Sequence, residues 1–198
     1  RRNFSDFLFK EVDIYGQHYA RYYREYYMEF DIKAESPGAL RFVLGQIASP
    51  SSPLREIMLT MKDNTQIDGL DKNEFMRALA VNLAEFDFVK RLMGEQAGKF
   101  PEFDKYKAIL EQMQMDIQDQ KEPAPKKDEQ AAMLMKRLSP LGRASFAIFS
   151  SEKDSYLNLV KQWLDSVGVP PQWQNVFLAP VWQAYFLGMA EIETEIDK

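Results

Sequence analysis

The stretch YGQHYARYYREYYMEF, residues 15–30, predicts the fold class of this chain. It holds six of the nine tyrosines and the single histidine, interleaved with arginine and glutamate. Its aromatic residues recur at spacings of three and four, so they share one side of an α-helix and leave the charges mainly on the other. We predict a helix to about Ile32 with these residues in the core or at a helix–helix interface: Tyr15, Tyr19, Tyr22, Tyr23, Tyr26, Tyr27 and Phe30.

The tyrosines of this helix suit a protein contact better than a nucleic-acid contact. Tyrosine combines a large apolar ring with a hydroxyl that needs a partner, as in a partly hydrated seam between helices. Basic residues in the stretch are matched by acidic ones, and the chain carries a net charge of −5, which disfavours binding to phosphates. Whether the hydroxyls contact the domain's own helices or another subunit stays open.

Helix signals continue along the rest of the chain. Ser36-Pro37 and Ser52-Pro53 each place a capping serine before a proline, which is favoured at the first helical position. Apolar spacing predicts one long helix over 75–93, another that begins at Pro101, and a helical pair between about 172 and 196. No alternating strand with a hairpin turn is evident. We predict an all-α fold of roughly eight to ten helices.

One segment has the composition of a linker. The residues QKEPAPKKDEQ, 120–130, contain proline, lysine and glutamate but no large apolar side chain. This predicts an N-terminal helical subdomain over 1–119 and a C-terminal helical subdomain over 131–198. The chain begins with Arg-Arg rather than Met, so we expect it to be part of a longer protein.

Tryptophans gather near the end of the chain. Trp163, Trp173 and Trp182 are followed by Tyr185 and flanked by further apolar residues. Helices that are apolar on more than one side pack into a core or against a neighbouring domain. We expect this region to support a domain that continues beyond Lys198.

The sequence offers little for catalysis or cofactor binding. There is no cysteine, which excludes disulfides and thiolate metal sites, and His18 has no second histidine beside which to bind a metal. The polar loop 63–74 fails as a calcium loop, because placing Gly69 at the sixth position puts Phe75 where glutamate is needed. Phosphate-binding, dinucleotide and hydrolase motifs are missing, as is any apolar run long enough to span a bilayer. We predict no catalytic residue, cofactor or metal.

The run LRFVLGQIASPSSPLREIMLTMKDNTQI, residues 40–67, resembles the IcmF/TssM family of secretion-system inner-membrane proteins. In that family a leucine-rich helix precedes a Ser-Pro-Leu turn, a second helix and a Thr-x-Leu-like exit. Here the turn is Ser52-Pro53-Leu54 and the exit is Thr65-Gln66-Ile67. The aromatic helix before them is similar to the family's Tyr…Tyr…Trp pattern, and residues 173–185 resemble its Trp-x-x-x-Val…Tyr stretch. One departure follows: the chain reads GMAEI at 188–192, where the family has an Arg-Tyr-Pro-Phe-like run.

The resemblance implies a helical part of the periplasmic region of an inner-membrane protein from a type VI or type IVB secretion system. Such proteins contact the membrane through other parts of the parent. They associate with a DotU/TssL-type inner-membrane protein, with a TssJ-type lipoprotein in type VI systems, and with further copies of themselves. The implied function is that of a non-enzymatic scaffold for the export apparatus.

Two other functions remain open from the residues. The first is a free-standing helical adaptor that binds a partner helix or peptide in a groove. The second is a hydrolase that uses paired carboxylates, because the chain has 30 aspartates and glutamates. Partner proteins recovered with the chain would distinguish the adaptor from the scaffold, and activity abolished by changing one carboxylate would establish the hydrolase.

Overall fold

A computed structural model describes residues 2–29, 32–67, 69, 73–118, 129–148 and 155–197. Within these residues the fold is all-α, which confirms the predicted fold class, and the one extended pairing is the isolated bridge between Gln96 and Lys99. The elements are α1 (Arg2–Met28), α2 (Pro37–Ala48), α3 (Pro53–Thr65), α4 (Glu74–Leu83), the 3-10 helix η1 (Ala84–Phe86), α5 (Asp87–Leu92), α6 (Pro101–Gln118), α7 (Glu129–Arg137), α8 (Pro140–Ile148), α9 (Tyr156–Val167) and α10 (Pro171–Ile196).

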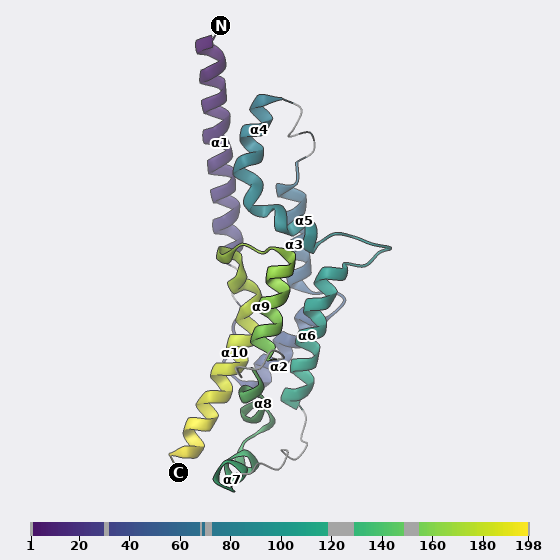
Figure 1. The fold of residues 1–198 in the computed structure, drawn as a ribbon, viewed down its shortest axis with the longest axis vertical. Coiled ribbons are helices and arrows are strands. Elements are labelled where there is room, and N and C mark those ends of the chain that lie inside the picture. The colour runs from purple at the N-terminus through teal and green to yellow at the C-terminus, as the bar shows by residue number, and fades with distance from the viewer. Residues whose placement is uncertain are drawn as a thin grey trace.

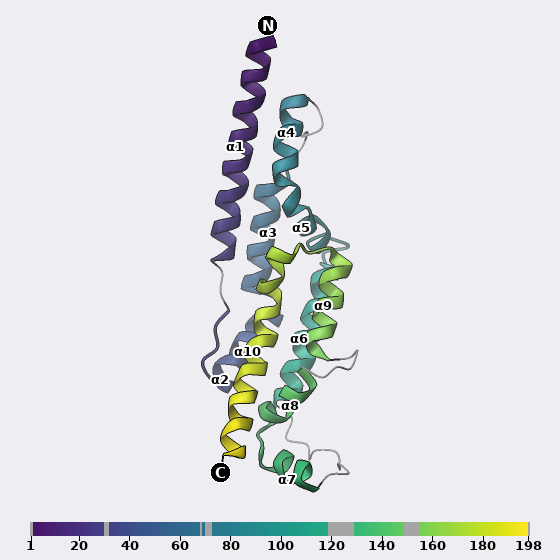
Figure 2. The same cartoon turned by 60° about the vertical axis from the view of Figure 1, so that its left-hand side comes forward.

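The helices form an elongated assembly with the two chain ends at opposite poles (Figures 1 and 2). At the N-terminal pole α1 lies along α4, and it extends past the end of that helix. At the other pole α6 packs against α2, α8 and α9, and α10 packs against α2, α8 and α9. The N-terminal pole is therefore thinner, and α1 has a neighbouring helix along only part of its circumference.

The structure confirms the two helix starts predicted at Ser36-Pro37 and Ser52-Pro53. The Ser36 hydroxyl accepts a 3.2 Å hydrogen bond from the Ala39 N–H at the start of α2. The Ser52 hydroxyl accepts one of 3.3 Å from the Arg55 N–H at the start of α3. Each cap satisfies a main-chain donor that the first helical turn leaves without a partner.

The single long helix predicted over 75–93 is wrong. α4 ends at Leu83, and η1 turns the chain before α5 begins at Asp87. A straight continuation would keep these residues beside α1, whereas the turn directs Phe86, Phe88 and Val89 into the core, where α5 contacts α3 and α6. The apolar spacing missed this break because one tight turn of helix barely changes the periodicity.

Other helices are longer or shorter than predicted. α1 runs without a break from Arg2 to Met28, so the predicted extension to about Ile32 is wrong. The predicted C-terminal pair is one helix, α10, with Pro180 in its interior. Proline has no N–H to donate to the carbonyl four residues earlier, but burial of this helix on several sides holds it together.

Most of the predicted linker lies outside the described residues, and α7 begins at Glu129 within its last two positions. Helices from both sides of it contribute to one hydrophobic cluster, because α2 contacts α10 and α6 contacts α8 and α9. The division into two subdomains stays a prediction.

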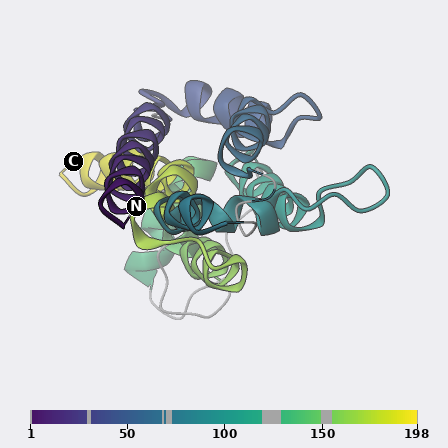
Figure 3. The ribbon, with the colours of Figure 1, turned by 90° about the horizontal axis from the view of Figure 1, so that it is seen from above.

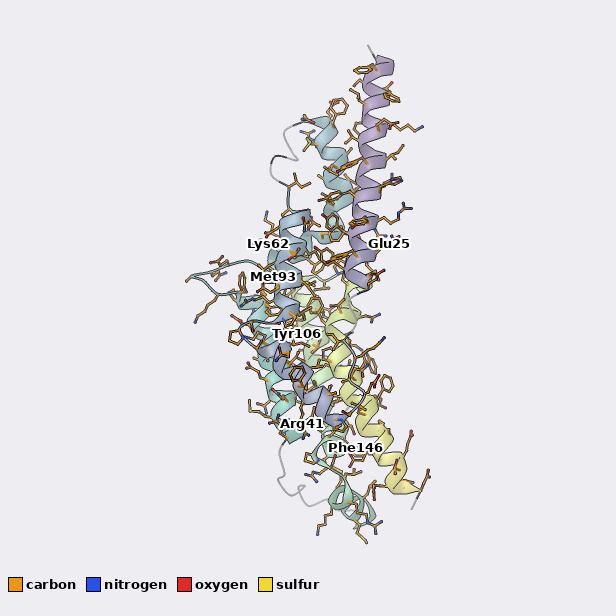
Figure 4. The ribbon with its side chains drawn as sticks, turned by 180° about the vertical axis from the view of Figure 1, so that it is seen from behind. Glu25, Arg41, Lys62, Met93, Tyr106 and Phe146 are labelled. Carbon is orange, nitrogen blue, oxygen red and sulfur yellow. The ribbon has the colours of Figure 1, made fainter. Side chains whose placement is uncertain are left out.

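Tyr106 lies at the centre of this cluster (Figure 4). Its ring stacks on Trp163 with 4.7 Å between ring centroids and meets the edge of Phe177 at 5.5 Å. Its hydroxyl donates a 2.8 Å hydrogen bond to the Phe177 carbonyl, and complete burial raises the pKa of this phenol. The Trp163 indole N–H donates to the Glu102 carbonyl at 2.9 Å, so the polar atoms of both rings are satisfied.

A close crossing joins α8 to α10. A Cβ atom on Gly188 would lie 2.6 Å from Cβ of Ser145 and 3.0 Å from the carbonyl oxygen of Leu141, so only glycine allows this approach. The Glu191 carboxylate accepts hydrogen bonds from the main-chain N–H and the hydroxyl of Ser139, directly before α8. A negative charge at this position is stabilised by the N-terminal end of the helix dipole.

Candidate interaction surface

The rotation of α1 about its axis is fixed by contacts with α4 and η1. Gly16 brings the two helices close, since a Cβ there would lie 2.9 Å from the Asn82 amide nitrogen. The Arg24 guanidinium donates two hydrogen bonds to the Glu85 carboxylate, the Nε bond measuring 2.9 Å. That pairing is also what raises the pKa of Arg24. Together these contacts decide which tyrosines face the protein.

Three of the tyrosines turn towards the body of the protein, and we call Tyr19, Tyr23 and Tyr27 the inner row. Their rings follow one another along α1, with centroids 4.7 Å apart between Tyr19 and Tyr23 and 5.9 Å apart between Tyr23 and Tyr27. The Tyr19 hydroxyl donates a 2.7 Å hydrogen bond to the Asn64 carbonyl at the end of α3. Burial, together with the neighbouring Tyr23, raises the pKa of Tyr19. The Tyr27 hydroxyl is buried and makes no hydrogen bond of normal geometry, although the Asn64 side chain lies close to it.

The other three face solvent, and we call Tyr15, Tyr22 and Tyr26 the outer row. Their exposed fractions are 60%, 64% and 59%. Each outer ring rests on an inner one: Tyr22 meets Tyr23 edge-on at 5.5 Å, and Tyr26 meets Tyr27 edge-on at 5.1 Å. The outer row is thus a supported aromatic surface, because its rings lean on side chains that are themselves packed.

The aromatic surface continues towards the N-terminus. Phe4 and Phe7, near the start of α1, are 67% and 56% exposed. The sequence prediction included neither residue, because the aromatic stripe that it identified began at Tyr15. If residues 4–27 are taken as one continuous helix, the spacing of Phe4 and Phe7 from Tyr15 places them on the same side of the helix as the outer row. Phe30, the last residue of the predicted stripe, lies outside the described residues.

The C-terminal aromatic residues divide between the core and the surface. Trp163 and Trp173 are buried, Trp173 between Phe86 and Phe88 with its indole N–H unpartnered. Trp182 and Tyr185 are half-buried on α10, beside Phe186, which is 60% exposed and stacks on Trp182 at 5.8 Å. The structure therefore brings Trp182 and Tyr185 together in a second aromatic patch, distant from α1 in sequence.

The Ser-Pro-Leu turn has a local structural role. Ser52 is buried and caps α3, Pro53 occupies the first helical position, and Leu54 is fully buried in the core. These contacts explain all three residues without a ligand. They start α3, the helix whose last turn receives the hydroxyl of Tyr19.

A polar pocket of about 330 Å³ lies between α1 and α4, with His18, Arg21 and Glu85 in its lining. His18 is exposed, and Arg24 in the same pocket is already paired with Glu85. Nowhere in the described part of the chain do three or more histidine, aspartate or glutamate side chains gather as metal ligands would. We find no arrangement in this pocket that assigns a chemical role to His18.

Comparison with known proteins gives no relative: no family model, curated protein or solved structure matches this chain. Across the described ranges, none of the helices is both long enough and apolar enough to cross a bilayer. Among the described residues, the outer row and its N-terminal continuation are the largest set of exposed aromatic side chains along one helix, and this set is the candidate site.

Proposed function

We propose that this chain is a non-enzymatic scaffold segment that binds protein partners through the outer row of α1. The observation that carries the proposal is the exposure of Tyr15, Tyr22 and Tyr26 on a helix whose other side is packed. Aromatic side chains with polar tips are enriched at protein interfaces, because they bury large areas at a small cost in conformational entropy. Glu11 and Glu25 on the same side favour a protein partner over an anionic surface.

The packing of α1 supports a scaffold function. The inner row, the Arg24–Glu85 pair and the close approach at Gly16 hold the outer rings before any partner arrives. A surface that is already ordered loses less side-chain entropy on binding, and so keeps more of its contact energy as affinity. A rigid helix that presents fixed rings can therefore position two proteins relative to each other.

We further propose that the complex is the envelope-spanning export apparatus of a bacterial secretion system. The support is the ordered resemblance of residues 40–67 and 173–185 to the IcmF/TssM family. On this proposal the chain is a periplasmic portion of an inner-membrane protein, and its partners include a DotU/TssL-type protein, a TssJ-type lipoprotein in type VI systems, and further copies of the chain.

The test compares two triple variants of the parent protein in its own cell. The first changes Tyr15, Tyr22 and Tyr26 to serine. The control changes Val81, Met115 and Met133 to serine, three residues exposed by 76%, 56% and 58% on other helices. We expect loss of export and of co-purified envelope proteins in the first variant only, with the isolated segment still folded and helical in both. Normal export and complex recovery from the tyrosine variant would refute the proposal.

A second candidate function is the adaptor, which a separate observation favours. An apolar pocket of about 270 Å³ lies between α2, the start of α3 and the segment before α2, with Ile32, Phe42 and Leu54 in its lining. Phe42 is 67% exposed, so a helix or peptide that inserts one apolar side chain could cover it. If Phe42→Ser, and not the tyrosine variant, removes the main partner, the adaptor function replaces the scaffold function.

A further inference from the structure

The exposed side of α1 carries two lines of side chains with a seven-residue repeat. Leu8, Tyr15 and Tyr22 form the aromatic and apolar line, and Glu11, His18 and Glu25 form the ionisable line. Their spacings alternate between three and four, so the two lines run next to each other as in the seam of a coiled coil. All six belong to one continuous helix, and five are exposed, Leu8 being half-buried.

The direction of a partner helix decides whether these lines match. In a parallel, in-register pair each residue meets its own copy, which places Glu11 on Glu11 and Glu25 on Glu25. In an antiparallel pair the two lines exchange, and the residues that face each other have numbers that sum to 33. Tyr22 then faces Glu11 of the second copy, and Tyr15 faces His18 of the second copy.

The pair of Tyr22 with Glu11 of the second copy is chemically favourable, while the third pair sets Glu25 opposite Leu8. A tyrosine hydroxyl can donate a hydrogen bond to a glutamate carboxylate, and such charge-assisted bonds are among the stronger ones in proteins. Arg21 lies one position before Tyr22, so its guanidinium comes within reach of the same Glu11 of the second copy. Within the monomer Arg21 and Glu25 meet only at 4.0 Å, with side chains 63% and 70% exposed, so neither is committed to a strong internal contact.

We infer that a second copy of this chain docks antiparallel on the outer side of α1. The inference rests on the proposed function, because it names the partner of the same surface. Figure 3 shows α1 beside α4 near the edge of the molecule, and the outer row on its other side is exposed. α1 has 27 residues and is about 40 Å long at 1.5 Å per residue, so the pairing spans more than three seven-residue repeats.

The first experiment uses sedimentation equilibrium to measure the association of the purified 198-residue chain and of variants in which one charge is reversed. We expect a concentration-dependent dimer that Glu11→Lys or Arg21→Glu each weakens at least about tenfold, because each creates a like-charge contact across the interface. The double variant Glu11→Lys/Arg21→Glu restores dimer formation, since the pair is re-formed with its charges exchanged. Glu193→Lys, an exposed position on α10, is the control and leaves association unchanged.

The second experiment determines the orientation and uses the absence of native cysteine. Leu8→Cys and Glu25→Cys proteins are mixed and oxidised. The antiparallel pair predicts a disulfide between the two different proteins, because these positions face each other, while two copies of position 8 lie roughly 25 Å apart along the axis. If two copies of the same variant form a disulfide as fast as the two different variants do, the antiparallel arrangement is overturned.

The two proposals fail in distinguishable ways. A chain that stays monomeric at all concentrations, or a charge-exchanged double variant that stays as weak as the single ones, overturns the second-copy inference alone. Loss of export and of envelope partners in the Tyr15, Tyr22 and Tyr26 serine variant would then still support the scaffold, with another protein on this surface. A dimer that survives all three serine changes overturns the inference, because it does not use the outer row.

Discussion

The hydroxyl of Tyr106 on α6 donates a 2.8 Å hydrogen bond to the main-chain carbonyl oxygen of Phe177 on α10. Both residues are fully buried, and the bond joins two helices that lie far apart in the sequence. Tyr27, at the end of α1, is also buried, but its hydroxyl makes no hydrogen bond of normal geometry. These two tyrosines provide a matched pair for measuring the contribution of a buried hydroxyl.

We predict different effects when each of the two is changed to phenylalanine. Tyr106→Phe lowers the free energy of unfolding by about 1 kcal/mol, because it removes a buried hydrogen bond. Tyr27→Phe leaves the free energy of unfolding unchanged or raises it by up to about 1 kcal/mol, because it removes a buried polar atom that made no hydrogen bond of normal geometry. Urea titrations with equal m-values measure both changes. Losses of similar size in the two variants would contradict the difference seen in the structure.

Stability is predicted to fall in alkaline solution. Burial raises the pKa of Tyr106 above its ordinary value of 10.0, and burial with the nearby Asp116 raises the pKa of Tyr156. A group whose pKa is higher in the folded state contributes stability that is complete below the unfolded pKa and is lost as pH rises above it. We therefore expect the free energy of unfolding to decrease progressively above about pH 10.

Two measurements check the alkaline prediction. Urea titrations at a series of pH values give the slope, which should be smaller in Tyr106→Phe because that group no longer titrates. The ultraviolet absorbance of tyrosinate should rise in two stages, the second of which coincides with unfolding. If all nine tyrosines ionise in one stage while the protein remains folded, the prediction is wrong.

The crossing of α8 and α10 predicts a position-specific effect of alanine. Gly188→Ala introduces a Cβ within 2.6 Å of Ser145 and 3.0 Å of a main-chain oxygen, so the two helices must separate. Overpacking of this kind costs about 1–3 kcal/mol. Gly38→Ala is the control: its Cβ would meet only one atom, at 4.0 Å, and alanine favours the helix by up to about 1 kcal/mol. Thermal unfolding should shift down for the first and not for the second; a matching shift in both would contradict the close crossing.

The loop between α5 and α6 predicts a stabilising substitution. It projects from the body (Figure 1), and Gln96 and Lys99 exchange two main-chain hydrogen bonds of 2.8 and 3.1 Å across Ala97 and Gly98. Both central residues have positive φ, 52° and 77°, which is the geometry of a type I′ turn. Asparagine tolerates this conformation better than alanine, so Ala97→Asn should raise the free energy of unfolding by about 0.5–1 kcal/mol.

The adjacent glycine is the control for this turn. Gly98→Ala adds a Cβ that meets no atom within 4 Å, so any cost must come from the backbone conformation alone. We expect a loss of about 1 kcal/mol, measured by urea titration beside Ala97→Asn. Equal and negligible effects of the two substitutions would show that the turn does not hold this conformation in solution.

Much of the fold could be predicted from local features. The serine caps before Pro37 and Pro53 were readable because the atoms that make them are three residues apart. The spacing of the tyrosines identified α1 for the same reason, since residues three or four apart on a helix are neighbours in space. The turn at η1 was not readable, because the reason for it is the burial of Phe86 and Phe88 beside Trp173, a residue almost ninety positions away.

The candidate surface was predicted only in part. The sequence placed all the tyrosines of residues 15–27 on one helix, but treated them as a single buried or interfacial face. The structure separates the inner row from the outer row, and it adds Phe4 and Phe7 to the exposed side. This division depends on Glu85 and Asn82, which fix the rotation of α1 from another helix.

The sequence by itself determined that this chain is helical, where several helices begin, and which side of α1 is aromatic, because these depend on contacts within a few residues. Only the tertiary structure decided which tyrosines lie inside. α3, α4 and η1 together cover a narrower arc than the six rings occupy, so Tyr19, Tyr23 and Tyr27 pack while Tyr15, Tyr22 and Tyr26 stay exposed. The physical reason is that apolar area is buried only where a neighbouring helix approaches, and the positions of those neighbours are set by residues distant in the sequence.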